Sequence, residues 1–289
     1  KIHMNYVLRF YPNVGMAGFL AHGGTERRDK SKPKTIAQRS IDVIYTGGIS
    51  RPNAYKIMPD FSKYDFDAKA IGDEVYEITI NNPGRTTEEV LEECLKKHGV
   101  TLSDEKLRDV IADMHYVDLF VVSHYREMTI KALADAGIHV TLYGFGWDDI
   151  DWISGSTVDY RGRISAFDIP ALMDDAKIVL STMTWFKDGT HDRVFNGMLH
   201  GAVSITDTSV YMEESFKGIY AGEDYKVDDA ELGFFRLDDM QNLPDMVRYI
   251  LENPDAAQKI ADTGYRRAKS SETWEARAIE LDRDLLVYM

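Results

Sequence analysis

The feature of the sequence that most constrains the fold is an alternation of short apolar runs with longer amphipathic segments. The short runs are rich in Val, Ile and Tyr, and several are apolar at consecutive positions, which is typical of strands covered on both faces. In the longer segments, apolar residues recur every three or four positions, as on one face of a helix. This alternation predicts an α/β fold: a Rossmann-like parallel sheet with helices on both faces.

The expected elements have definite bounds. Strands are expected over residues 41–46, 139–143, 177–181 and 202–206, and two more over 157–160 and 233–237. Helices are placed where a polar capping residue or Pro precedes an apolar helical period. They are expected over residues 86–97, 103–122 with a continuation to 136, 167–175, 192–200, 243–252, 254–269 and 274–287.

The first forty residues differ from the rest of the chain. Residues 25–38 are rich in Arg, Lys, Ser and Thr around Pro33, which is typical of a linker. We therefore predict that residues 1–40 are the remnant of an N-terminal domain plus a linker, and that residues 41–289 form the sheet domain. Residues 60–138, between the first two strands, are long for one crossover and predict a helical insertion.

Composition narrows the classes of partner. The chain has 289 residues, with 34 Lys+Arg against 48 Asp+Glu and a net charge of −14. The electrostatic field of a protein with this negative charge repels nucleic acid, so no nucleic-acid partner is expected. Cys94 is the only cysteine, which excludes a disulfide framework and fits a cytoplasmic protein. No run approaches the roughly 20 apolar residues of a membrane helix, so no membrane span is expected.

Glycines follow the first predicted strand, in the sequence Thr46-Gly47-Gly48, with Arg51 close behind. Gly47 and Gly48 would let backbone N–H groups approach a phosphate, and Arg51 would supply positive charge. The full dinucleotide fingerprint is missing, which disfavours a nicotinamide cofactor and leaves a tight turn with a surface arginine as the alternative.

A second glycine-rich turn follows the strand at 139–143. Tyr143, Gly144 and Gly146, with Phe145 and Trp147 beside them, would form a ligand wall at the carboxyl edge of an open sheet. A hydrophobic turn without a ligand is the alternative.

Two further motifs have weaker support. Arg161 and Arg163 follow the strand at 157–160 and would clamp a diphosphate, or else belong to a solvated basic turn. Asp149 and Asp151 have the spacing of an Asp-x-Asp metal site, but acids this close are common in so acidic a chain. No metal site and no cofactor are expected, because no His, Cys and Asp set has zinc-site spacing.

The strongest segment covers residues 185–207, where a polar loop leads into a helix and a further strand. Asp188 lies in the loop, His191 and Arg193 lie at the helix start, and Asn196 follows on the helix. The free N–H groups of a helix start favour an anion, and the His191 and Arg193 side chains add donors. Alternatively, Arg193 pairs with an acid on a neighbouring helix and His191 is a solvated cap.

This segment, with residues 143–147 before it and 273–277 after it, resembles the nucleotide-sugar-binding half of GT-B glycosyltransferases. The similarity is to the bacterial spore-maturation-like group (glycosyl transferases group 1), and it extends from about Ile41 to the C-terminus. The resemblance implies the C-terminal donor-binding domain of a metal-independent transferase, whose acceptor pocket belongs to an N-terminal domain.

The resemblance also implies roles for individual residues. Many GT-B enzymes carry two glutamates separated by seven residues, and these positions correspond to Asp188, which would contact the donor sugar, and Asn196, which would contact the ribose. Asp keeps the charge on a shorter arm, and Asn keeps an acceptor without charge. Arg51 or Arg193 would neutralise the diphosphate leaving group.

The expected function is therefore transfer of a sugar from a nucleotide diphosphate sugar, a UDP-sugar by expectation, to an unknown glycan, protein or small-molecule acceptor. The catalytic residues would be Asp188, His191 and Arg193. Two alternatives stay open: a non-catalytic nucleotide-sugar-binding or scaffolding module with a degenerate donor site, and a GT-A transferase that binds metal through Asp149 and Asp151.

Overall fold

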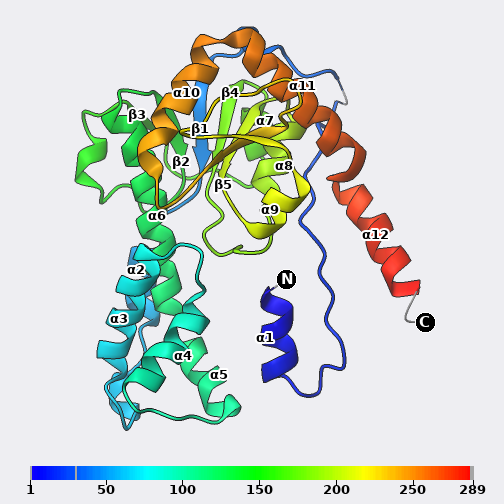
Figure 1. Ribbon diagram of the computed structural model, residues 1–289. Coiled ribbons are helices and arrows are strands. Elements are labelled where there is room, and N and C mark those ends of the chain that lie inside the picture. The colour runs from blue at the N-terminus through cyan, green and yellow to red at the C-terminus, as the bar shows by residue number, and fades with distance from the viewer. Residues whose placement is uncertain (1, 30, 287–289) are drawn as a thin grey trace. The chain divides into compact units, whose positions relative to one another are not determined.

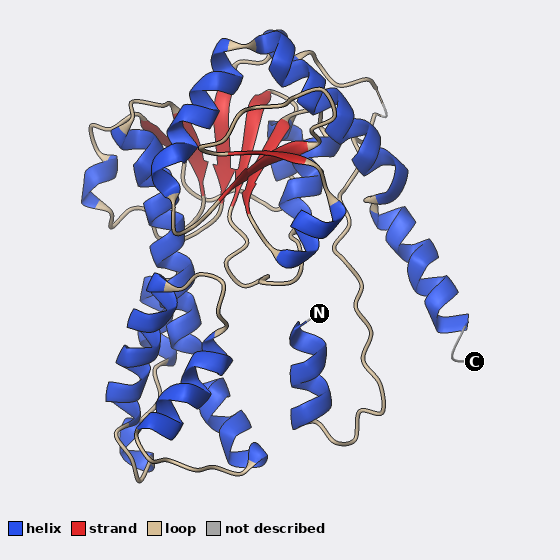
Figure 2. Cartoon of the chain, in the orientation of Figure 1, coloured by secondary structure: helices blue, strands red, loops and turns tan. Residues whose placement is uncertain are grey.

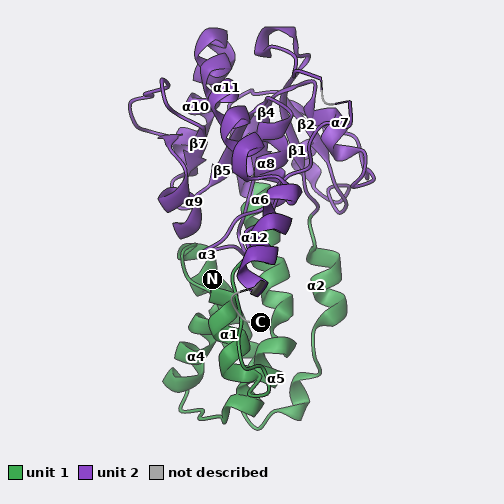
Figure 3. Cartoon of the chain, turned by 90° about the vertical axis from the view of Figure 1, so that its right-hand side faces the viewer, with its two compact units in different colours: residues 1–19, 49–127 green, residues 20–48, 128–289 purple. Residues whose placement is uncertain are grey.

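The computed structural model describes residues 2–29 and 31–286 (Figure 1). Contacts within the chain group it into two compact units (Figure 3). Unit 1 comprises Lys1–Phe19 and Ile49–Glu127, and unit 2 comprises Leu20–Gly48 and Met128–Met289. Unit 1 is therefore largely an insertion in the sequence of unit 2, and the segment ahead of the first strand belongs with the sheet.

Unit 2 is built on a seven-stranded sheet in which every neighbouring pair of strands is parallel, in the order β3-β2-β1-β4-β5-β7-β6. The strands are β1 Ile41–Thr46, β2 Val140–Tyr143, β3 Val158–Tyr160, β4 Ala176–Ser181, β5 Val203–Asp207, β6 Gly218–Tyr220 and β7 Leu232–Phe235. After β1 the chain builds β2 and β3 on one side and then crosses to β4 on the other. The order of the sheet thus reverses between β1 and β4, which is where open α/β sheets bind ligands, outside the carboxyl ends of the strands.

Helices lie on both sides of this sheet (Figure 2). They cover its central strands, which are therefore buried along most of their length. One apolar cluster joins β1 and β4 to the short helix α7, through Ile44, Val179 and Met173. Another joins α8 to β7 and α11, through Phe195, Met198 and Phe234. The helices of unit 2 are α7 Ile169–Met173, α8 Asp192–Leu199, α9 Val210–Ser215, α10 Leu243–Glu252, α11 Pro254–Ser271 and α12 Trp274–Leu286, with 3-10 turns at Ile36–Gln38, Asp151–Ile153 and Met240–Asn242.

Unit 1 is helical. Its elements are α1 Ile2–Phe10, α2 Arg51–Ile57, a 3-10 turn at Phe61–Lys63, α3 Ala68–Asn81, α4 Thr87–Lys97, α5 Asp104–Asp113 and the first part of α6 His115–Asp135. The buried faces of α3 and α4 carry fully buried aliphatic side chains, among them Val75, Val90 and Leu91. Arg9 of α1 reaches Glu92 and Asp104, which ties the N-terminal helix to α4 and α5.

The predicted fold class is confirmed: a parallel Rossmann-like sheet surrounded by helices. The strand expected over 41–46 has the predicted bounds, and the other five differ by one or two residues. The single helix expected over 103–122 is wrong, because it ends at Asp113 and a second helix begins at His115. The helix expected over 167–175 is shorter, at Ile169–Met173, and residue 287, the end of the last predicted helix, lies outside the described residues.

None of the described helices combines the length and apolar character needed for a membrane span. The predicted remnant of a preceding domain in residues 1–40 stays a prediction. In the structure, those residues are divided between the two units at Leu20. The helical insertion predicted for 60–138 overlaps the second part of unit 1, Ile49–Glu127, and its last helix, α6, continues to Asp135.

Candidate functional site

The candidate site lies at the carboxyl edge of the sheet, where β1 and β4 end side by side. Its centre is Arg193, from the first turn of α8, whose side chain is nine-tenths buried. The guanidinium Nε donates to the hydroxyl of Thr46, 3.1 Å away, and Nη1 donates to the hydroxyl of Ser181, 3.3 Å away. Thr46 is the last residue of β1 and Ser181 the last of β4. A cation is thereby fixed at the point where the strand order reverses.

The start of α8 explains this position. His191 is the N-cap residue, with extended backbone, and its Nδ1 accepts a hydrogen bond from the N–H of Arg193 at 3.2 Å. This bond satisfies one of the N–H groups that a helix start leaves open. Burial, with the Arg193 charge nearby, lowers the pKa of His191, although the Asp192 carboxylate, 2.6 Å from Nδ1, acts in the opposite direction. The prediction that Arg193 and His191 share one helix start is confirmed, and His191 is a cap.

Asp188 lies in the loop between β4 and α8, residues 182–191. Two hydrogen bonds from the chain after β5 hold this loop: Ser209 Oγ donates to the Gly189 carbonyl at 2.6 Å, and the Val210 N–H donates to the Lys187 carbonyl at 3.1 Å. At its start, the Met183 N–H donates to the buried carboxylate of Asp207 at 2.5 Å. The loop is therefore shaped by its neighbours, and the sugar contact of Asp188 stays a prediction.

Two hydroxyls of this loop, those of Thr184 and Thr190, are buried and have no hydrogen-bond partner within the described residues. Buried polar groups are nearly always paired, and an unpaired one costs about 1–3 kcal/mol. Both flank the segment that leads into α8.

Asn196 is engaged within the protein. Its side-chain oxygen accepts a hydrogen bond from the N–H of Thr25 at 2.7 Å, and its amide nitrogen donates to Asp192 at 3.4 Å. The side chain is also nearly fully buried. The ribose contact implied by the resemblance stays a prediction, and Asn196 has a second role as an anchor for the segment around Thr25.

The glycine turns after β1 and β2 meet at the same edge. The Gly47 N–H donates to the Tyr143 carbonyl at 2.8 Å, and Trp147 Nε1 donates to the Gly47 carbonyl at 2.7 Å. A Cβ atom on Gly144 would lie 2.3 Å from the Gly47 carbonyl oxygen, so only glycine permits this approach. The structure thus brings Gly47, Tyr143 and Gly144 together at this edge, and the ligand wall expected around Tyr143, Gly144 and Gly146 stays a prediction.

The remaining predicted residues are more dispersed. A Cβ atom on Gly48 would meet the ring of Phe145 at 2.6 Å, and the guanidinium of Arg163 lies 5.6 Å from the centre of the same ring. Gly146 has a positive φ of 78° in the same turn. Arg51 belongs to unit 1, where it forms an ion pair with Glu127 at 2.5 Å.

Sequence reasoning missed the two hydroxyls that hold Arg193. The available signal was a polar residue at the end of each of two neighbouring predicted strands, since Thr46 and Ser181 close runs that are otherwise largely apolar. It also missed Asp207, which closes β5 in the same way. Burial raises the pKa of this carboxyl group to about 6.

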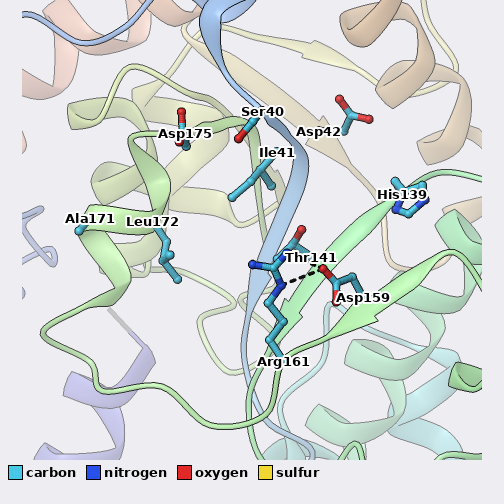
Figure 4. Close-up of a pocket in the computed structure, with 10 residues that line it drawn as sticks. All are labelled: Ser40, Ile41, Asp42, His139, Thr141, Asp159, Arg161, Ala171, Leu172 and Asp175. Atoms are coloured by element: carbon cyan, nitrogen blue, oxygen red, sulfur yellow. Dashed lines mark hydrogen bonds and ion pairs between the residues drawn. The ribbon is translucent and has the colours of Figure 1, made fainter.

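A pocket of about 480 Å³ lies elsewhere in unit 2, over the first residues of β1 and β2 and against α7 (Figure 4). Three aspartates line it, and each is paired: Asp42 with Lys177, Asp159 with Arg161, and Asp175 with Lys34, at 2.6–2.7 Å. These ion pairs neutralise the carboxylates of the pocket and leave no excess of positive charge to attract a diphosphate. The pocket also lies away from the carboxyl edge of β1 and β4.

Residues 2–29 and 31–286 contain no group of three or more His, Cys, Asp or Glu side chains placed to hold a metal ion. Asp149 and Asp151 lie in and beside a 3-10 turn after β2. The metal-dependent alternative that rests on these two aspartates stays a prediction.

Among the solved structures to which the chain is similar are the following three. Anabaena HepE in complex with UDP and glucose is 19% identical with a TM-score of 0.44, over 56% of this chain and 44% of that one. Sucrose-phosphate synthase from Thermosynechococcus elongatus is 17% identical with a TM-score of 0.43, over 56% and 42%. An S. aureus TarM variant in complex with Fondaparinux, alpha-GlcNAc-glycerol and UDP is 11% identical with a TM-score of 0.48, over 98% and 42%. The chain spans less than half the length of each.

A comparison with curated proteins finds no match. The sequence pattern of the family described as glycosyl transferase-like matches residues 126–283, more than half of the chain. The matched part contains β2 to β7 and the whole segment from Asp188 to Asn196. The chain belongs to this glycosyl transferase-like family.

Proposed function

We propose that the chain binds a nucleotide diphosphate sugar at the carboxyl edge of the sheet and takes part in transferring the sugar to an acceptor. The observation that carries this proposal is the position of Arg193, held by Thr46 and Ser181 where the strand order reverses. Family membership supports sugar transfer as the reaction. The UDP present in the HepE and TarM structures supports a UDP-sugar as the donor.

The chemistry follows from where charge develops. Breaking the bond between the anomeric carbon and the phosphate oxygen leaves negative charge on the departing diphosphate. The Arg193 guanidinium and the N–H groups at the start of α8 would stabilise this charge more strongly in the transition state than in the bound donor. Because hydrogen bonds to the strand ends fix Arg193 beforehand, little reorganisation is needed at that step.

Calorimetric titration with UDP, GDP, ADP and the corresponding UDP-sugars tests the proposal. We expect saturable binding of at least one diphosphate, and Arg193→Ala is expected to weaken it by roughly 1–3 kcal/mol through loss of a charged hydrogen bond. Arg248→Ala is the matched control, because Arg248 is an arginine of unit 2 that is paired with Asp245 in α10. Absence of binding by every nucleotide, in protein that unfolds cooperatively, would contradict the proposal.

The second candidate is a binding or scaffolding module with a degenerate donor site. The engagement of Asn196 by the Thr25 N–H favours it, since a ribose would have to compete for the same oxygen. Under this alternative, the nucleotide binds and no sugar is transferred. The measurement that separates the two candidates is the release of free UDP from a UDP-sugar over hours, which reports hydrolysis or transfer of the sugar. Release supports the transferase, and its absence in protein that binds the nucleotide supports the module.

A further inference from the structure

The segment His22-Gly23-Gly24-Thr25, which we call the anchor segment, is fixed against the start of α8. The Thr25 N–H donates to Asn196 on α8 at 2.7 Å. Gly24 forms a parallel bridge with Thr273, in which its N–H donates to the Glu272 carbonyl at 2.6 Å and its carbonyl accepts from the Trp274 N–H at 3.1 Å. Main chain that is bonded on two sides in this way has a defined position.

Close packing explains why two glycines occur here. A Cβ atom on Gly24 would lie 2.6 Å from a methyl carbon of Leu199 and 2.8 Å from Cβ of Phe195, both on α8. A Cβ atom on Gly23 would lie 2.8 Å from the backbone nitrogen of Trp274. The anchor segment can therefore approach both elements only because these residues have no side chain. Arg277 completes the attachment, since its Nε donates to the His22 carbonyl at 3.2 Å.

This attachment places the His22 ring among the rings at the candidate site. Its centre lies 5.3 Å from that of Phe186 and 6.0 Å from that of His191, and both neighbours are approached edge to face. Trp274 lies 6.3 Å away. Phe186 precedes Asp188 in the loop after β4, and His191 caps α8. A second imidazole thus stands beside the helix start that carries Arg193.

The His22 ring is incompletely bonded. Its Nδ1 is buried and has no hydrogen-bond partner within the described residues, although an imidazole has a donor or acceptor at each nitrogen. The ring contacts with Phe186 and His191 are edge-to-face packing, which involves no hydrogen bond of Nδ1. A buried polar atom nearly always has a hydrogen-bond partner, and the position of this ring beside the start of α8 is the reason to look for that partner in a ligand.

Resting on the function proposed above, we propose that His22 is a further contact of the bound nucleotide sugar, through a hydrogen bond from its imidazole to a phosphate oxygen at the start of α8. The anchor segment would then serve as a wall of the donor site, in addition to linking the parts of the chain before and after it. The partner chemistry is an anionic oxygen, because the same helix start carries the Arg193 charge and the positive end of the helix dipole.

The test measures binding of UDP and of the UDP-sugar that wild type prefers to His22→Phe and His22→Gln. Phe keeps the ring packing and removes both nitrogens, so we expect roughly tenfold weaker binding of both ligands. Gln keeps an N–H donor, and a smaller loss is expected. His139→Ala is the matched control, as an exposed histidine of unit 2 at the start of β2. A thermal scan of each variant shows that it is folded.

The outcomes separate this inference from the proposed function. If His22→Phe binds both ligands within twofold of wild type while Arg193→Ala weakens them, the His22 contact is wrong and the proposed function stands. If only the UDP-sugar is affected, the contact with phosphate is wrong, because the lost partner is then the sugar. If wild type binds no nucleotide, the proposed function fails first.

Discussion

At the scale of single residues, polar side chains that close buried strands shape the site. Thr46, Ser181 and Asp207 end β1, β4 and β5, and each bonds to a group of the loop or helix that follows β4. Sequence reasoning identified Arg193 because a helix start with donors has a recognisable pattern. It could not identify the residues that hold Arg193, because a Thr or Ser at a strand end is common. His22 was missed for another reason: its ring meets His191 only through packing between distant segments.

Asp207 gives a pH-dependent prediction. Burial raises the pKa of its carboxyl group to about 6, above its ordinary value near 4. Between pH 4 and 6 the folded protein therefore binds more protons than the unfolded chain, and this group lowers the free energy of unfolding as the pH rises. Asp207→Asn removes the contribution. We expect the free energy of unfolding of wild type to fall relative to the variant by up to about 3 kcal/mol between pH 4 and 7, in urea titrations. If the free energies of unfolding of wild type and Asp207→Asn change with pH in parallel, the raised pKa of Asp207 is contradicted.

At the scale of elements, the central strands were predictable because they are long and apolar at consecutive positions. The strand β6, Gly218–Tyr220, was not predicted; it is short and begins with a glycine, a residue that is depleted in strands. Neither Gly nor Pro marks the break between α5 and α6 at Met114, so nothing local separated those two helices. Local pattern thus predicted the sheet better than the helices of unit 1.

The packing of α8 on the sheet gives a prediction at this scale. A Cβ atom on Gly197 would lie 2.4 Å from Ser204 Oγ and 2.9 Å from Val179 Cβ, so α8 is seated directly on β4 and β5. We expect Gly197→Ala to lower the free energy of unfolding by about 1–3 kcal/mol through overpacking, although alanine is the better helix former. Gly84→Ala is the control, because nothing lies within 4 Å of its added methyl group. Equal stability of both variants in urea would show that α8 can move away from the sheet.

At the scale of the whole molecule, the chain divides into two compact units, and the residues of the candidate site belong to unit 2. Every predicted site residue except Arg51 belongs to unit 2. We therefore expect two unfolding transitions in calorimetry. A saturating nucleotide should raise the midpoint temperature of one of them, that of unit 2. Val75→Ala, at a buried position of unit 1, is expected to lower the midpoint temperature of the other transition, that of unit 1, by removing buried aliphatic volume. A single transition shifted by both changes would mean that the units unfold together.

The interruption of unit 2 by unit 1 also has a consequence for biosynthesis. β1 pairs with β2 and β4, and both of these strands are translated after the whole of unit 1. On the ribosome, the inner strand β1 consequently emerges long before either of its neighbours exists. The helices of unit 1 follow one another almost without interruption and can consolidate during that interval, so a nascent chain should acquire helical protection first and sheet protection late.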